Sequence, residues 1–296
     1  MKNSRNISMD KLRSYSSAFS RSVFFDIVEF GDFAHINWML TQEENVDEFI
    51  TYSDYFSYLY SWLKKEYQCE YFFKNEIISQ YILKKLGTEN SIIFNEFRVG
   101  ESIVDLAMFN GESKAFEIKT NFDSPKRLLK QLDSYRRIFN KVYLIVSYDR
   151  LHQYLDIIPN CIGVLSLSVR RNRVIIDMIR EAETSMNLDC EVLMRCLRTK
   201  EYRNIVQKFY QTLPKEDENF YTICLDALKA IPKQNLNQLF ITEIKNRKSI
   251  TNLLYDIPLE FRQVCLSLNL SLRKTEILIN NLSRTINLKP ICISRI

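Results

Sequence analysis

Six short apolar runs in the middle of the chain have the length and residue types of β-strands. A helix that begins at Ser124 and Pro125 separates the third run from the fourth, because serine followed by proline is a common helix start. The two runs around this helix therefore predict parallel strands joined by a right-handed crossover. The six predicted strands cover residues 92–99, 103–109, 114–119, 142–146, 163–169 and 174–179.

On both sides of these runs, apolar residues recur at helical spacing. Before the strands, helices are predicted over residues 12–40, 46–62 and 67–86. After residue 182 the pattern is helical throughout, with helices near 190–197, 202–212, 220–230, 236–245, 259–268 and 275–286. We therefore expect an α/β protein with a three-layer α/β/α core and a mixed sheet at 67–181. An N-terminal helical extension at 1–66 and a C-terminal helical region at 182–296 would flank this core.

The predicted helix at 46–62 is rich in aromatic residues, among them Tyr55 and Phe56. Such rings stack on bases in some nucleic-acid-binding proteins. Their spacing fits a buried helical face, however, and basic residues are not interleaved with them. The pattern therefore favours core packing.

Composition narrows the class of protein. With 46% hydrophobic and 26% charged residues, the chain is typical of globular proteins. No apolar run approaches the ~20 residues of a membrane span, and the N-terminus lacks an apolar secretory segment. The seven cysteines show no paired spacing, and the two histidines are far apart, so reduced thiols and no zinc site are expected. We expect a cytoplasmic protein that does not bind membranes.

Three charged residues interrupt the second and third predicted strands: Asp105, Glu117 and Lys119. Charges inside apolar strands are costly unless they pair or bind something. Glu117 and Lys119 are two apart, so they share one face of their strand. Asp105 falls opposite Glu117 on that face if the intervening loop has an odd number of residues, with Gly111 at positive φ. A two-residue loop would place the two carboxylates on opposite faces.

Two carboxylates and an ammonium at strand ends can hold a divalent cation and a water molecule. Hard oxygen ligands from Asp105 and Glu117 suit Mg²⁺, for which Mn²⁺ can substitute, and the Ile118 carbonyl is a third candidate ligand. Lys119 would position a water and offset charge that develops on a phosphate. Glu76, on the helix before the hairpin, would complete the metal site, although a surface position is the default for a helical glutamate. The alternative is that Glu117 and Lys119 form an exposed edge-strand pair.

The net charge is +5 and tolerates a polyanionic partner without requiring one. Local clustering says more, because several basic residues lie on or beside the helix that begins at Ser124. They predict a nucleic-acid-binding surface, although a solvated helix face is an equal alternative for this cluster taken alone. The predicted nucleic-acid-binding residues are Lys126, Arg127, Lys130, Arg136 and Arg137.

The ordered set of residues and elements over about 70–147 resembles the PD-(D/E)xK nuclease superfamily, whose core is restriction-endonuclease-like. The matching residues are Glu76, Asp105, Glu117, Lys119, Gln131 and Tyr135. Val104 replaces the proline of the motif, a frequent departure in that superfamily. The resemblance implies that Gln131 and Tyr135 orient the nucleic-acid backbone or the catalytic residues.

We therefore predict a Mg²⁺-dependent deoxyribonuclease that acts in defence against foreign DNA, mobile-element biology or DNA repair. Two alternatives stay open. One is a nuclease that acts on RNA, because the site contacts phosphate rather than sugar. The other is a non-catalytic nuclease-like fold that binds a protein partner as an immunity or regulatory factor. The C-terminal helices could recognise substrate, bind a partner or form a homodimer.

Overall fold

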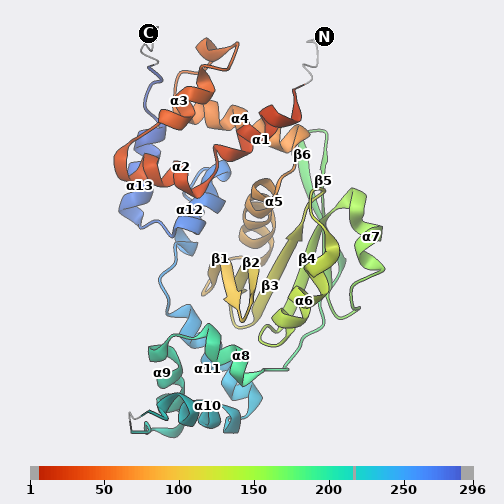
Figure 1. The fold of residues 1–296 in the computed structure, drawn as a ribbon, viewed down its shortest axis with the longest axis vertical. Coiled ribbons are helices and arrows are strands. Elements are labelled where there is room, and N and C mark those ends of the chain that lie inside the picture. The colour runs from red at the N-terminus through yellow and green to blue at the C-terminus, as the bar shows by residue number, and fades with distance from the viewer. Residues whose placement is uncertain (1–6, 216–217, 288–296) are drawn as a thin grey trace. The chain divides into compact units, whose positions relative to one another are not determined.

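The computed structural model describes residues 7–215 and 218–287, and their contacts group into two compact units (Figure 1). Unit 1 contains Met1–Asn75 and Leu253–Ile296, and unit 2 contains Glu76–Asn252. The helices after residue 181, predicted as one region, are shared between the two units. Each unit is described by itself below.

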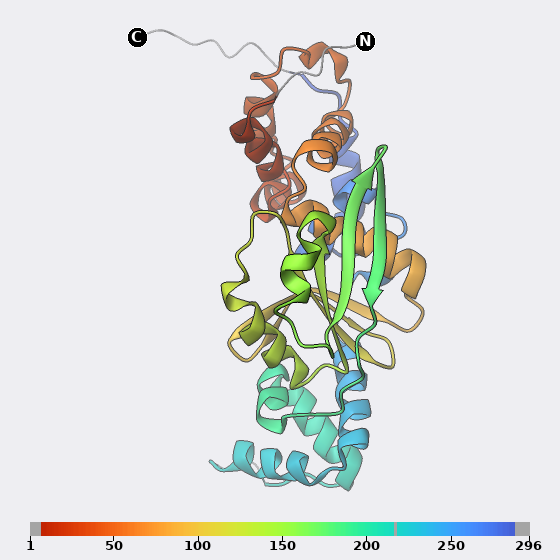
Figure 2. The same ribbon diagram turned by 90° about the vertical axis from the view of Figure 1, so that its right-hand side faces the viewer.

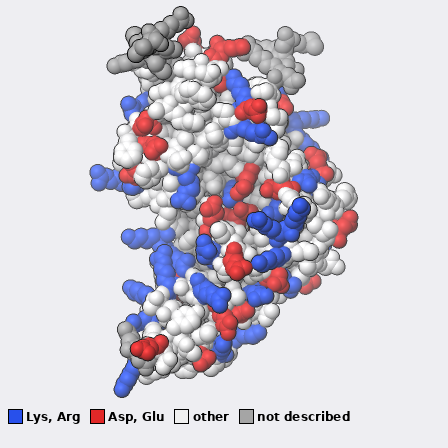
Figure 3. Space-filling view, in the orientation of Figure 1, with Lys and Arg blue, Asp and Glu red and all other residues white. Residues whose placement is uncertain are grey.

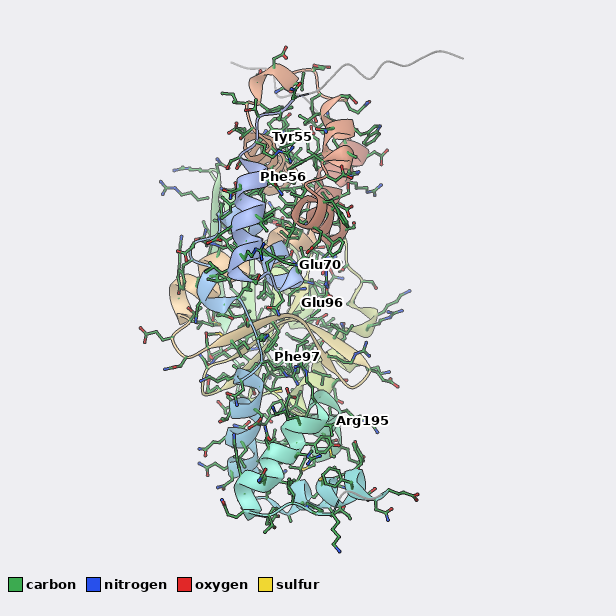
Figure 4. All side chains as sticks on the ribbon, turned by 90° about the vertical axis from the view of Figure 1, so that its left-hand side faces the viewer. Tyr55, Phe56, Glu70, Glu96, Phe97 and Arg195 are labelled. Carbon is green, nitrogen blue, oxygen red and sulfur yellow. The ribbon has the colours of Figure 1, made fainter. Side chains whose placement is uncertain are left out.

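Unit 1 is helical. The segment predicted as one helix over 12–40 forms three, because Ser20 caps a new helix start and Gly31, at φ 61°, ends that helix in the left-handed conformation. Tyr55 and Phe56 are fully buried among other rings, which confirms core packing (Figure 4). The helices are α1 (Met9–Ser17), α2 (Arg21–Phe30), α3 (Ala34–Leu40), η1 (Val46–Glu48), α4 (Tyr52–Glu66), α5 (Glu70–Glu76, whose last residue is in unit 2), η6 (Leu259–Phe261), α12 (Arg262–Leu268) and α13 (Leu272–Leu282).

Unit 2 is built on a six-stranded mixed sheet in which the strands follow one another in sequence order. The pairs β3–β4 and β4–β5 are parallel and the other three pairs are antiparallel, so the predicted parallel pairing of β3 and β4 is confirmed. All six predicted strands are present, with ends that differ from the prediction by one residue at most. They are β1 (Ile92–Val99), β2 (Ser102–Phe109), β3 (Ser113–Lys119), β4 (Lys141–Ser147), β5 (Gly163–Arg170) and β6 (Arg173–Arg180).

Helices cover both faces of this sheet (Figures 1 and 2). On one face, Leu132 of α6 packs in a core with Val142 and Leu144 of β4. On the other face, Tyr81 of η2 meets Phe116 of β3 with ring centroids 6.2 Å apart. The predicted helix over 67–86 is α5 continued by the π-helical η2. The bounds are η2 (Ile77–Leu86), η3 (Pro125–Arg127), α6 (Leu128–Arg136), η4 (Tyr148–Arg150) and α7 (Leu151–Leu155).

Four helices after β6 extend the core of unit 2. Phe240 of α11 lies 5.9 Å from Phe109 of β2 between ring centroids, so these helices pack on the sheet as well as on one another. The helices are α8 (Cys190–Cys196), α9 (Thr199–Tyr210), α10 (Phe220–Ala230) and α11 (Lys233–Lys245), and η5 (Thr251–Leu253) follows them. No helix within 7–215 and 218–287 has the length and apolar character needed to cross a membrane.

The fold is thus mixed α/β, with an open six-stranded sheet between helices and with helical regions before and after it. Of the seven cysteines, Cys292 lies outside the described residues, and the other six are free thiols, as expected. Residues 216–217, between the predicted helices 202–212 and 220–230, are also outside the described part.

Candidate catalytic site

The hairpin of β2 and β3 has the odd-numbered loop that brings the two carboxylates together. Phe109 pairs with Ser113, which leaves a three-residue loop in which Gly111 has a φ of 106°. The register then runs to Leu106 opposite Phe116. Continued by one residue, it places Asp105 opposite Glu117.

Asp105 lies where the hydrogen-bonded ladder between β2 and β3 stops. Its carboxylate Oδ2 accepts the backbone N–H of Ile118 at 2.8 Å. The side chain thus satisfies a backbone donor that the neighbouring strand no longer serves. This bond fixes the Asp105 carboxylate beside the chain segment that carries Glu117 and Lys119.

Glu117 is a buried carboxylate, with 1% of its surface exposed. Oε1 accepts Lys119 Nζ at 2.6 Å, and Oε2 lies 2.8 Å from the Tyr135 hydroxyl. That hydroxyl is also 2.6 Å from the Ile103 carbonyl oxygen and has only one proton to donate. Burial raises the pKa of Glu117, and the negative charge of Asp105 raises it further, against the opposing effect of Lys119.

Lys119 joins the strand pair to helix α6. Its ammonium donates to Glu117 and, at 3.2 Å, to Oε1 of Gln131 on α6. Burial acts to lower the pKa of Lys119, but the Glu117 carboxylate outweighs burial and the pKa is raised. The lysine is therefore a cation at neutral pH, and its ammonium is held between Oε1 of Glu117 and Oε1 of Gln131.

The structure thus brings five of the predicted residues into one connected cluster. Asp105, Glu117 and Lys119 come from the strands, and Gln131 and Tyr135 come from one face of α6, four residues apart. The cluster lies at the edge of the sheet where parallel strands β3 and β4 end, with Lys119 level with Val146.

Glu76 is buried at the junction of α5 and η2. The helix it begins packs on Phe116, whose side chain projects to the other face from Glu117. Within the described residues, no group of three His, Cys, Asp or Glu side chains is arranged to hold a metal ion. The role assigned to Glu76 stays a prediction.

The donor set nevertheless fits Mg²⁺ by its chemistry. Two carboxylates from adjacent strands face each other, and the mutual repulsion that raises the pKa of Glu117 would be relieved by a divalent cation. Mg²⁺ is commonly held by one or two carboxylates and keeps several water molecules. Asp105, Glu117 and the Ile118 carbonyl would hold it.

The predicted basic cluster is divided along α6. Lys126 and Arg127 are exposed in η3, at the end of the helix next to the site. Lys130 pairs with Glu101 at 3.2 Å. Arg136 and Arg137 lie at the other end of α6, and Arg137 pairs with Asp133 and Asp189. In the middle of Figure 3, basic side chains lie beside acidic ones over this part of the molecule.

Arg150 stabilises the loop at the edge of the site, a role that no motif in the sequence predicts. Its Nη1 donates to the carbonyl oxygens of Thr120, Asn121 and Asp123 at 2.9–3.2 Å. These bonds fix the loop between β3 and α6, and so the path from Lys119 to Gln131. A sequence carries no signal for such contacts, because every residue has a backbone carbonyl.

Comparison with known proteins identifies a family of phage proteins. The model of the family described as Bacteriophage P4 protein cII matches residues 63–284. Protein cII of Enterobacteria phage P4 is 27% identical over 176 residues, which cover 58% of this chain and 66% of that protein, just under two thirds. No solved structure matches. Because the family model covers well over half of the sequence, this chain belongs to the bacteriophage P4 protein cII family.

Proposed function

We propose that this protein is a metal-dependent nuclease that hydrolyses phosphodiester bonds in DNA. The observation that carries the proposal is the convergence of Asp105, Glu117 and Lys119 beside Gln131 and Tyr135. The carboxylates of Asp105 and Glu117 lie close together at a largely buried site although their charges repel each other. Such unfavourable arrangements of charge are typical of functional sites. The resemblance to PD-(D/E)xK nucleases supports the same assignment.

Each residue has a stated task in such a reaction. Lys119 holds positive charge where a phosphate would lie, offsets the charge that develops on it and positions the attacking water. Gln131 and Tyr135 are positioning residues, since one accepts from Lys119 and the other contacts Glu117. Bound Mg²⁺, or Mn²⁺ in its place, would supply a Lewis acid and lower the pKa of a water molecule.

Exposed basic side chains next to the site favour a polyanionic substrate. Lys126 and Arg127 are exposed on the loop side of α6, where they can contact phosphates on either side of the cleaved bond. We propose that the reaction takes place in the cytoplasm. It would serve defence against foreign DNA or DNA processing. A homodimer or a protein partner on the C-terminal helices is compatible with the same site.

The test is cleavage of labelled DNA and RNA by purified protein with Mg²⁺ or Mn²⁺. Asp105→Ala and Lys119→Ala should each lower the rate by about a thousandfold, the size of effect seen when one charge-stabilising group is removed. The matched control is Lys114→Ala, because Lys114 is also a largely buried lysine of β3, ion-paired with Glu112 at 3.0 Å. It should cleave like wild type.

Three results would change the proposal. Cleavage of RNA alone would assign the site to RNA. If every substrate stays intact and no calorimetric Mg²⁺ site depends on Asp105 and Glu117, the enzymatic proposal fails and a binding role for the nuclease-like fold takes its place. Cleavage that survives in both site variants would place the chemistry elsewhere in the chain.

A further inference from the structure

Two exposed aromatic rings lie at the edge of the sheet where the candidate site is found. Strands β3, β4 and β5 are parallel, so their carboxyl ends share this edge. Phe122 follows β3 and is 56% exposed, and Tyr148 follows β4 and is 46% exposed. Both rings are therefore accessible to a ligand that lies along this edge.

The loop that carries Phe122 is fixed by hydrogen bonds. Asp123 Oδ2 accepts both the backbone N–H of Thr120, at 2.8 Å, and its hydroxyl, at 2.7 Å. Arg150 donates to three carbonyl oxygens of the same loop. The backbone beneath Phe122 is therefore ordered before any partner binds, which lowers the entropic cost of binding.

The tip of the β5–β6 hairpin adds positive charge to this edge. Arg170, Arg171 and Arg173 are all exposed, and the two-residue turn at Arg171 and Asn172 has φ of 48° and 61°. The Arg170 guanidinium carbon lies 5.1 Å from the centroid of the Tyr148 ring. An arginine and an exposed ring thus already form one contact surface.

The β5–β6 hairpin projects beyond the other strands (Figure 2), and the strand register carries it past the level of the candidate site. Lys119 is level with Val146, and Val146 is level with Ser166. Arg170 lies four residues further along β5, or about 13 Å at the usual rise per residue in a strand. The basic tip is therefore within a few nucleotides of the site for a strand that lies along this edge.

We propose that this edge binds single-stranded nucleic acid. Phe122 and Tyr148 stack on unpaired bases, and Arg170 and Arg171 hold phosphates on the Tyr148 side. Bases in a duplex are already stacked on one another, so exposed rings at this edge suit an unpaired strand. Rings with arginines beside them at the end of β5 also fit a polyanion better than an apolar protein surface. The binding proposal does not depend on the nuclease function proposed above. The identification of the bound strand as the substrate does rest on that function.

The experiment measures fluorescence anisotropy of a short unstructured oligonucleotide and of its duplex, with the full chain in EDTA. The single strand should bind more tightly than the duplex. Tyr148→Ala and Phe122→Ala should each weaken single-strand binding by about tenfold, the loss expected for one stacked base. Tyr148→Phe should bind like wild type, because stacking needs the ring and not the hydroxyl.

Controls match the variants in residue type and exposure. Tyr221 on α10 is 45% exposed, and Tyr221→Ala should leave binding unchanged. Arg170→Ala should reduce the slope of log affinity against log salt by about 0.7, the value for one phosphate contact on a single strand. Arg195→Ala on α8, where the arginine is exposed in Figure 4, should leave that slope unchanged. Thermal melts confirm that each variant is folded.

Two results overturn the inference: equal or tighter binding of the duplex, or wild-type affinity in folded Tyr148→Ala and Phe122→Ala proteins. Failure of the nuclease proposal is distinct from both. A protein that never cleaves but loses single-strand binding in these variants retains the surface without the reaction. A protein that cleaves DNA while both variants bind normally retains the reaction without the surface.

Discussion

The ion pairs Glu201–Arg247 and Glu117–Lys119, both in unit 2, each contain a buried glutamate but behave in opposite ways. In the helices, the Glu201 carboxylate of α9 accepts hydrogen bonds from Nε and Nη2 of Arg247, at 2.8 and 2.6 Å. It also accepts one from the backbone N–H of Arg198 at 2.7 Å. Burial acts to raise the pKa of Glu201, but these donors outweigh it and the pKa is lowered. The carboxylate is stable as an anion, and the pair fastens helix α9 to the segment after α11.

Glu117 in the sheet has Lys119 at 2.6 Å, yet its pKa is raised. Burial is the main cause and Asp105 is the next, because a second carboxylate faces it from β2. One lysine does not neutralise two carboxylates. The comparison teaches that a satisfied buried pair serves stability, whereas a pair left with excess negative charge is suited to bind a cation.

The largest contrast should appear when the cation of each pair is removed. Arg247→Met leaves Glu201 buried as an anion and should cost about 3 kcal/mol in the free energy of unfolding. Lys119→Met should cost no more than about 1 kcal/mol, because the pKa of Glu117 is already raised and the carboxylate can take up a proton once the lysine is gone. Urea denaturation measures both. The double variant Glu201→Gln with Arg247→Met should recover part of the loss, and equal costs for the two single variants would contradict the comparison.

Magnesium should separate the pairs by a somewhat smaller amount. At about a tenfold excess over its dissociation constant, a cation bound only by the folded state adds about 1.4 kcal/mol of stability. We expect Mg²⁺ to raise the melting temperature of wild type and of Glu201→Gln but not of Asp105→Asn. Glu76→Gln tests the remaining predicted ligand, since a site that includes Glu76 should bind Mg²⁺ about tenfold more weakly without it. A melting temperature that Mg²⁺ leaves unchanged would remove the metal from the proposal.

The smallest effect is the pH dependence of stability in EDTA, because titration changes charge and removes no side chain. The lowered pKa of Glu201 means that its contribution is present above the ordinary value of 4.5 and is lost as pH falls below it. The raised pKa of Glu117 has the opposite sign, since its contribution is present below 4.5 and is lost as pH rises through the raised pKa. Glu201→Gln should flatten the dependence of stability on pH below about 4.5. Glu117→Gln should flatten it at higher pH, up to the raised pKa of Glu117. The reverse assignment would refute the comparison.

Local patterning was sufficient to predict much of unit 2. The apolar runs located all six strands, because alternation and β-branched residues reflect the local pleat. The odd loop at Gly111 was identified as the condition for the site, and the structure satisfies it. The prediction failed at residues 12–40, where helical periodicity continues through Ser20 and Gly31 although both interrupt the helix.

The sequence by itself determined the residue types and their order: strands with Asp105, Glu117 and Lys119, followed by a helix with Gln131 and Tyr135. Only the tertiary structure decided which groups meet, because hydrogen bonds such as Ile118 N–H to Asp105 and Tyr135 to Glu117 join segments that no local pattern relates. It also decided that Arg150 fixes the loop at the site and that the predicted basic cluster divides along α6. The reason is physical: local propensity depends on neighbours in the chain, whereas charge, burial and pKa depend on neighbours in space.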